Sequence, residues 1–212
     1  SVAPLGATLG IWDGHDAGVA LIQDGQLVFA LSEERLSRVK RCSGFPFLAL
    51  QRCLSSCGLL PIDVDQIVVA GRYGRFLMRA GDALYRGRSP DRNPLGMAST
   101  LMRGLEIGVS RLPGVRGLEH AGSLGVLHSR LANLGFRCPV QFIDHHVAHA
   151  WTARLLGLDD AMTVTMDGYG DGLAGTIDAF GSCDEYKSPA YSVALVYGAV
   201  TRLLGFGEGE EG

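Results

Sequence analysis

A strand–turn–strand pattern occurs twice in the sequence, and this repeat constrains the fold more than any single motif. Residues 9–25 read "LGIWDGHDAGVALIQDG" and residues 164–181 read "VTMDGYGDGLAGTIDAFG". Each copy has an apolar strand ending in Asp-Gly, a polar turn with a second aspartate and a glycine, and another strand. A single copy is an ordinary acidic hairpin. Two copies predict a duplicated two-lobe fold with a cleft between the lobes.

The segments after the first copy indicate an α/β lobe with a mixed sheet. The two strands of the first copy and a third, within "QLVFALSEERL" (26–36), form an antiparallel meander. A helix is expected in "FPFLALQRCLSSCGL" (45–59), which has a proline near its start and a glycine at its end. Buried strands follow in "DQIVVAG" (65–71) and "VQFIDHH" (140–146). We therefore expect a first lobe over residues 1–158 and the beginning of a second over 159–212.

Composition excludes several classes of protein. A chain of 212 residues with 47% hydrophobic content is long enough to form one large or two small hydrophobic cores. Its net charge of −3 argues against a protein whose main role is to bind nucleic acid. Five cysteines without framework spacing fit a reducing cytoplasm better than a disulfide scaffold. The N-terminus does not resemble a signal peptide, and the most apolar later run, "YSVALVYGAV" (191–200), is too short to span a membrane. We expect a cytoplasmic protein with no membrane partner.

An arginine-rich stretch runs from about residue 72 to residue 130. It carries ten arginines against four acidic residues and includes a predicted helix around "MASTLMRGLEIGVSRL" (97–112). The stretch is either a patch for phosphate groups or an anionic partner, or the solvated face of a helical insertion. The second interpretation is the more ordinary one, and the sequence alone does not assign a role to this stretch.

Three of the six histidines lie within five residues of "IDHHVAHAWTARLLG" (143–157), where a strand gives way to a helix. If Asp144 caps this helix, His145 and His149 stand one turn apart on the same face. A lone histidine is usually a satisfied polar residue, but two imidazoles on one face can hold a metal ion. The helical zinc-peptidase motif requires a glutamate where His146 stands, so a zinc peptidase is not expected.

Aspartates at the strand ends of the two repeats also suit a bound metal or phosphate. The glycines that follow them let a ligand approach the backbone. In open α/β sheets the carboxyl ends of strands are where ligands bind. The histidine pair therefore requires further ligands from elsewhere in the chain, and these strand ends are one source.

Several motifs together resemble successive blocks of the nodulation-factor and antibiotic-tailoring O-carbamoyltransferases. These motifs are "WDGHDAGVALIQDG", "SEERLSRVK", "IDHHVAHA", "MDGYGDG" and "TRLLGFGEGEEG". Their order and approximate spacing match from residue 8 to the last residue. "SEERLSRVK" alone would be a weak signal, and the arginine-rich stretch is not matched.

The resemblance implies the N-terminal module of such an enzyme. That module has the actin-like ATPase (ribonuclease H-like) fold and is related to the tRNA threonylcarbamoyladenosine-synthesis proteins. It passes a carbamoyl group from carbamoyl adenylate, made from carbamoyl phosphate and ATP by a C-terminal module in the same protein, to the hydroxyl of a small-molecule acceptor. The resemblance also implies that the second lobe is only begun here. We therefore expect this chain alone to bind metal weakly and to lack transferase activity.

The resemblance also implies roles for individual residues. The metal ligands fall on His145, His149 and Asp167, with one further aspartate outside this chain. Two imidazoles and a carboxylate suit iron, manganese or zinc. His15 matches a histidine proposed to move the proton of the acceptor hydroxyl. Asp13, Asp16 and Asp171 are candidates for the nucleotide side or for carboxylates around the metal site, although each is equally explicable as a plain turn residue. Gly168 and Gly170 are candidates for the nucleotide side.

Two other interpretations of the function of these residues remain open. A metal-dependent hydrolase or kinase of the same fold would use the same ligands, and a non-catalytic nucleotide- or metal-binding lobe would act only with a partner. Histidine and aspartate ligands do not identify the metal. The sequence also does not identify the acceptor or the oligomeric state.

Overall fold

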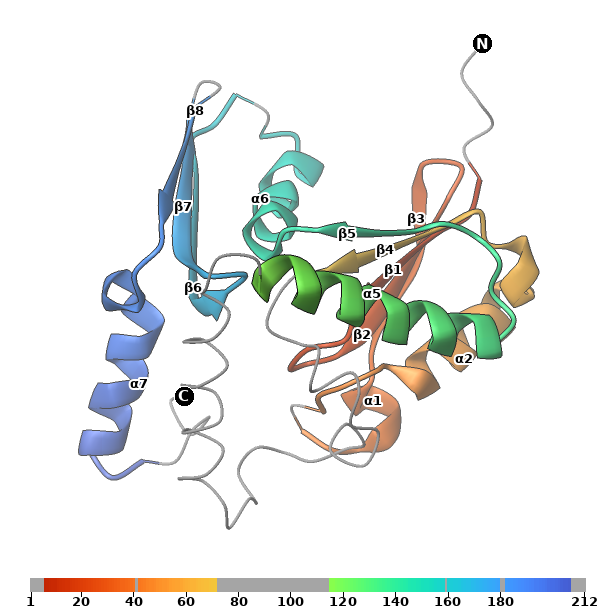
Figure 1. Cartoon of the computed structure of the whole chain (residues 1–212), viewed down its shortest axis with the longest axis horizontal. Helices are drawn as coiled ribbons and strands as arrows, with labels where there is room; N and C mark the ends of the chain where they lie inside the picture. The colour runs from red at the N-terminus through yellow and green to blue at the C-terminus, as the bar shows by residue number, and fades with distance from the viewer. Residues whose placement is uncertain (1–5, 41, 72–114, 159, 180–181, 207–212) are drawn as a thin grey trace. The chain divides into compact units, whose positions relative to one another are not determined.

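The computed structural model describes residues 6–40, 42–71, 115–158, 160–179 and 182–206 (Figure 1). The chain forms two compact units, Ser1–Ile143 and Asp144–Gly212, and each is described by itself. We had expected the boundary after residue 158. The helix that follows Asp144 packs on strands of the second unit, which is why the units divide before that helix.

The first unit is built on one five-stranded mixed sheet. Its strands are β1 (Thr8–Trp12), β2 (Gly18–Gln23), β3 (Gln26–Ser32), β4 (Gln66–Ala70) and β5 (Val140–Ile143). The sheet order is β3-β2-β1-β4-β5, with β1, β2 and β3 antiparallel and with β4 and β5 parallel to β1. This is an α/β lobe with a mixed sheet, as predicted.

The expected helix of the first unit is confirmed as α2 (Phe47–Cys57). It begins after Pro46 and ends at Gly58, whose φ of 66° is left-handed and suits a residue without a side chain. The carboxylate of Glu33 accepts the backbone N–H groups of Leu48 and Ala49 at 3.0 and 2.8 Å. These contacts satisfy two of the donors that the first turn of a helix leaves unpaired. The shorter elements nearby are α1 (Glu34–Ser37) and η1 (Pro61–Asp63).

A further helix, α5 (Val115–Asn133), was not predicted from the sequence. Three glycines interrupt it, which lowers its intrinsic helical propensity. Its leucines nevertheless join the core of the first unit, where Leu127 and Leu131 are fully buried beside the sheet. Tertiary packing therefore outweighs local propensity here. Most of the arginine-rich stretch, including the helix expected over 97–112, lies outside the described residues.

The second unit contains the second copy of the repeated hairpin. Strands β6 (Thr163–Gly170) and β7 (Leu173–Ala179) pair antiparallel, which confirms the predicted strand–turn–strand. Strand β8 (Ser182–Tyr186) completes a sheet of order β6-β7-β8. The remaining elements are α6 (His145–Leu155), η3 (Pro189–Tyr191) and α7 (Val193–Leu203). The two helices, α6 and α7, both contact β6.

No helix in the part of the chain that the structure describes is both long enough and apolar enough to cross a membrane.

Candidate metal centre

Helix α6 carries the histidine cluster and begins at His145 (Figure 1). Asp144 occupies the N-cap position, and its carbonyl accepts the first helical bond, from Ala148 N, at 2.9 Å. The N-cap position expected for Asp144 is confirmed, but its side chain makes no capping hydrogen bond among the described residues. The carboxylate of Asp171 acts instead, accepting the N–H of His145 at 2.8 Å. The cap comes from the β6–β7 turn rather than from the adjacent residue.

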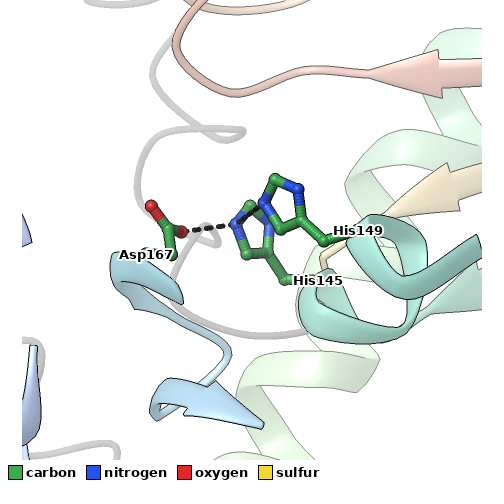
Figure 2. Close-up of side chains that lie close together, drawn as sticks. All are labelled: His145, His149 and Asp167. Atoms are coloured by element: carbon green, nitrogen blue, oxygen red, sulfur yellow. Dashed lines mark hydrogen bonds and ion pairs between the residues drawn. The ribbon is translucent and has the colours of Figure 1, made fainter. Parts of the chain in front are cut away.

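An irregularity in strand β6 brings Asp167 to the same place. The pairing runs from Met166 opposite Gly175 to Gly170 opposite Leu173, so three residues of β6 stand opposite one residue of β7. Extra residues of this kind form a bulge, which bends a strand and redirects its side chains. The Asp167 side chain thereby reaches helix α6 (Figure 2).

Three side chains converge at this point. The Asp167 Oδ2 atom lies 2.6 Å from Nε2 of His145, and Nε2 of His149 lies 3.1 Å from the same His145 nitrogen (Figure 2). One potential ligand atom from each residue lies within 4.8 Å of the other two. The two rings meet edge to face, with centroids 4.6 Å apart. His145 and His149 therefore stand on one face of α6, as predicted, and Asp167, which the resemblance implied as a third ligand, lies beside them.

The carboxylate of Asp167 is held in its charged form. Its hydrogen bond with His145 is the main cause of a pKa below the usual range, and the N–H of Gly168 contributes by donating to Oδ1 at 2.6 Å. Partial burial acts in the opposite direction but does not prevail. An ionised carboxylate offers only acceptor oxygens, which is the form that coordinates a cation.

The main chain of Asp167 is also fixed. Its carbonyl accepts the hydroxyl of Ser192 at 2.7 Å, and Ser192 is 1% exposed. The same hydroxyl oxygen accepts the N–H of Leu195 at 3.1 Å, so Ser192 caps helix α7 while it holds the strand that carries Asp167. Our reasoning from sequence missed Ser192, although a serine before the apolar run 193–203 is a usual signal for the start of a helix.

The donor set fits a divalent metal. Two imidazole nitrogens and one carboxylate oxygen are ligands that iron, manganese and zinc accept, and both histidines present the same ring atom. His145 is buried at 6% exposure, whereas His149 is exposed and Asp167 is partly exposed. The three residues therefore combine one buried side chain with two that solvent can reach.

The middle histidine of the cluster, His146, has a structural role. Its ring is 2% exposed, its Nε2 donates to the carbonyl of Leu173 at 3.1 Å, and its Nδ1 lies 2.8 Å from the hydroxyl of Thr165. Thr165 in turn bonds the hydroxyl of Thr176 at 2.7 Å and accepts its N–H at 3.1 Å. These contacts employ both ring nitrogens and join α6 to β6 and β7, which leaves His146 unsuited to coordinate a metal.

Two further predicted residues of the second unit contact His145. Asp171 accepts its N–H, as described, and Gly170 lies directly against its ring. A Cβ atom at position 170 would stand 2.2 Å from Cδ2 of His145, whereas a Cβ at Gly168 would meet nothing within 4 Å. In the structure Gly170 and Asp171 both contact His145. Their role in nucleotide binding stays a prediction.

The other predicted residues lie in the first unit, after strand β1. Asp13 is buried at 1% exposure. His15 and Asp16 are exposed and paired, with Nδ1 of the imidazole 3.0 Å from the carboxylate. The indole N–H of Trp12 donates to the carbonyl of His15. Because Asp16 accepts at Nδ1, the Nε2 atom of a neutral His15 is the one available to take up a proton.

Comparison with known proteins agrees with the sequence motifs. The family described as Carbamoyltransferase N-terminus matches residues 7–211. The nodulation protein NolNO of Sinorhizobium fredii is 31% identical over 93% of this chain, and nodulation protein U of Rhizobium tropici is 36% identical over 41% of it. The matched regions make up 26% and 16% of those two proteins, so the chain spans only a fraction of their length.

Among solved structures, YeaZ from Pseudomonas aeruginosa is similar, with 14% identity and a TM-score of 0.35 over 86% of this chain and 66% of that one. Among relatives found by sequence, an uncharacterised protein of Methanocaldococcus jannaschii is 24% identical over 93% of this chain and 30% of its own length. Since the family match covers nearly the whole sequence, this chain belongs to the carbamoyltransferase N-terminus family.

Proposed function

We propose that this chain is the N-terminal part of a carbamoyltransferase that moves a carbamoyl group from carbamoyl adenylate to a hydroxyl group of a small-molecule acceptor. In this proposal His145, His149 and Asp167 bind a divalent metal. Family membership supports the transferase activity. The observation that carries the metal centre is the convergence of two imidazole nitrogens and a carboxylate within 4.8 Å.

The metal centre would serve acyl transfer. A bound divalent ion polarises the oxygen of a carbonyl or phosphoryl group and so favours attack on the carbamoyl donor. His145 and His149 supply neutral nitrogen ligands from one helix, and Asp167 supplies a negative charge that lowers the net charge of the site. The depressed pKa of Asp167 keeps this ligand available throughout the neutral range.

His15 is the proposed proton acceptor. The acceptor hydroxyl oxygen forms a bond to the carbamoyl carbon, its proton passes to Nε2 of His15, and the bond from that carbon to the adenylate oxygen breaks. The products are a carbamate ester and AMP. Asp16 holds Nδ1 of His15 at 3.0 Å, which favours the tautomer that this step requires. Asp13, Gly168, Gly170 and Asp171 remain candidates for the nucleotide side.

Titration calorimetry of the 212-residue chain with manganese(II) or iron(II) tests the metal centre. The His149→Ala variant should bind at least about tenfold more weakly than the unmodified chain, since it lacks one of three ligands. The matched control is His128→Ala, which removes an exposed imidazole from helix α5 of the first unit and should bind normally. Equal binding by the His149 variant and the unmodified chain would refute the metal centre.

Turnover by the full-length protein tests the transferase. With carbamoyl phosphate, ATP and an alcohol, a carbamoyltransferase produces AMP and carbamate ester in equal amounts. Release of AMP and free carbamate that does not depend on the alcohol would indicate a hydrolase. Transfer of phosphate to the alcohol would indicate a kinase, and absence of any product with a broad set of alcohols would favour a non-catalytic lobe.

A further inference from the structure

The turn between β6 and β7 contacts His145 at two separate places. The carboxylate of Asp171 accepts the backbone N–H of His145 at 2.8 Å. The backbone of Gly170 lies close to the imidazole, where a Cβ atom would come within 2.2 Å of Cδ2 and 2.7 Å of Cγ. One contact fixes the main chain of this candidate ligand, and the other limits the positions of its ring.

The contact with Asp171 replaces a cap that the helix does not obtain locally. The first N–H groups of a helix have no acceptor inside the helix, and His145 is the first residue of α6. The side chain of Asp144, at the N-cap, makes no capping bond among the described residues. The first turn of α6 is therefore anchored by a residue that lies 26 positions later in the chain.

The backbone conformation of the β6–β7 turn does not require the contact between Asp171 and helix α6. Asp171 and Gly172 have φ values of 51° and 86°, as in two-residue hairpin turns with positive φ at both centres. Asp24 and Gly25 of the β2–β3 hairpin have almost the same values, 51° and 79°. Asp24 is exposed, so the same turn forms without a helix to cap.

We propose that the β6–β7 turn is the positioning element of the metal centre, with Asp171 and Gly170 together setting the orientation of the His145 imidazole. This inference rests on the proposed function, because it assigns His145 as a ligand. Asp171 is a positioning residue that acts through the His145 main chain. Gly170 acts through its missing side chain, which leaves room for the ring where its Nε2 atom contacts Asp167.

Such support has a measurable consequence. A ligand that is already oriented loses little freedom when a metal binds, and removal of groups that orient ligands commonly lowers metal affinity by about 10–100-fold. Loss of the Asp171 carboxylate should therefore weaken metal binding although Asp171 does not contribute to the set of three ligands. It should also change the coordination geometry of the metal that still binds.

The Asp171→Gly variant isolates the carboxylate. Glycine adopts positive φ without strain, so the turn keeps its conformation while the cap is lost. Asp24→Gly makes the same replacement in the matching turn of the first unit. Asp171→Asn is the conservative variant, since an amide oxygen still accepts an N–H and asparagine tolerates this conformation.

The first readout is metal-free NMR of the 212-residue chain. Amide exchange at His145 should accelerate about tenfold or more in Asp171→Gly, because no helical acceptor protects this first-turn N–H. The contact between the ring Hδ2 of His145 and the α-protons of Gly170 should weaken in the same variant. Both signals should remain normal in Asp24→Gly and recover largely in Asp171→Asn.

The second readout is the visible spectrum of cobalt(II) at saturating metal concentration. The proposal expects a changed d–d band in Asp171→Gly and in Gly170→Ala, with a normal band in Asp24→Gly and in Gly125→Ala. The last variant places a methyl group where it meets nothing within 4 Å. A merely structural cap would lower the unfolding temperature but leave the saturated spectrum unchanged.

Each result decides one of the two proposals. Unchanged His145 exchange and ring contacts in Asp171→Gly, or a saturated spectrum that superimposes on that of the unmodified chain, overturn the positioning role. If the unmodified chain binds no cobalt, the metal centre of the proposed function fails. The NMR measurement then still shows whether the turn orients His145, because it requires no metal.

Discussion

Nε2 of His145 lies 2.6 Å from the carboxylate of Asp167, which joins the first turn of helix α6 to the bulged part of strand β6. The contact lowers the pKa of Asp167 because the ionised carboxylate accepts the hydrogen bond from the imidazole. The same pair therefore serves two purposes. It stabilises the second unit, and it presents two candidate ligand atoms at one point.

The Asp167 pKa predicts a loss of stability in acid. A carboxyl group whose pKa is lower in the folded state stabilises that state above its unfolded pKa, here 3.8, and the contribution disappears as the pH falls through the lower folded value. The metal-free second unit should therefore lose roughly 1–3 kcal/mol of unfolding free energy below about pH 4. Urea unfolding followed by Trp151 fluorescence in a Trp12→Phe background measures this loss.

Comparison of variants assigns the acid transition to Asp167. Asp167→Asn should be less stable than the unmodified chain at pH 6 and should show a smaller decrease between pH 6 and pH 3. Asp184→Asn, on the exposed strand β8, is the control and should follow the unmodified chain. An acid-induced decrease of the same size in Asp167→Asn would show that another group is responsible.

A second prediction concerns the buried ring of His146. His146→Ala removes bonds to Thr165 and Leu173 and leaves a cavity between α6 and the sheet, so it should lower the unfolding free energy by roughly 2–4 kcal/mol. His128→Ala, at an exposed position, should change it by less than about 0.5 kcal/mol. Normal stability combined with lost metal binding in His146→Ala would instead make His146 a ligand.

Sequence patterns predicted most elements of the first unit because those elements depend on local signals. Strand β4 is almost wholly apolar, and α2 has a proline at its start and a glycine at its end. Helix α5 lacks such signals, since its glycines disfavour a helix and only its contacts with the sheet reveal its apolar face. The unit boundary depends on how α6 packs, which no local pattern records.

In the candidate site, too, local sequence signals predicted some features and missed those that depend on the tertiary fold. The spacing of His145 and His149 predicted one shared face of a helix, and that face is observed. Asp167 came from family resemblance, because its approach depends on a strand bulge that alternating hydrophobicity does not reveal. Asp144 is the N-cap of α6, as predicted, but the carboxylate that accepts a first-turn N–H belongs to the distant Asp171. Long-range hydrogen bonds of this kind follow from the tertiary fold alone.

A third prediction concerns Glu33, a buried carboxylate at the start of helix α2. It is 6% exposed and accepts two backbone N–H groups. Glu33→Ala should lower the unfolding free energy of the first unit by about 2 kcal/mol, the upper range for a helix cap. Its neighbour Glu34, which is partly exposed and lies 3.8 Å from Arg35, provides the control, and Glu34→Ala should cost less than about 1 kcal/mol. Equal effects of the two substitutions would contradict a capping role for Glu33.

The last prediction concerns His15 and is made for the full-length protein. If Nε2 of His15 takes the proton of the acceptor hydroxyl, His15→Ala should lower turnover by roughly a hundredfold or more, while metal content stays unchanged. Asp16→Asn should have a smaller effect, since it weakens the 3.0 Å contact that orients the ring but leaves the imidazole in place. Asp24→Ala, in an exposed turn of the same unit, should turn over normally. Steady-state rates and metal analysis of the purified variants distinguish the outcomes. Loss of metal together with activity would make His15 a ligand, and an unchanged rate would leave it a turn residue.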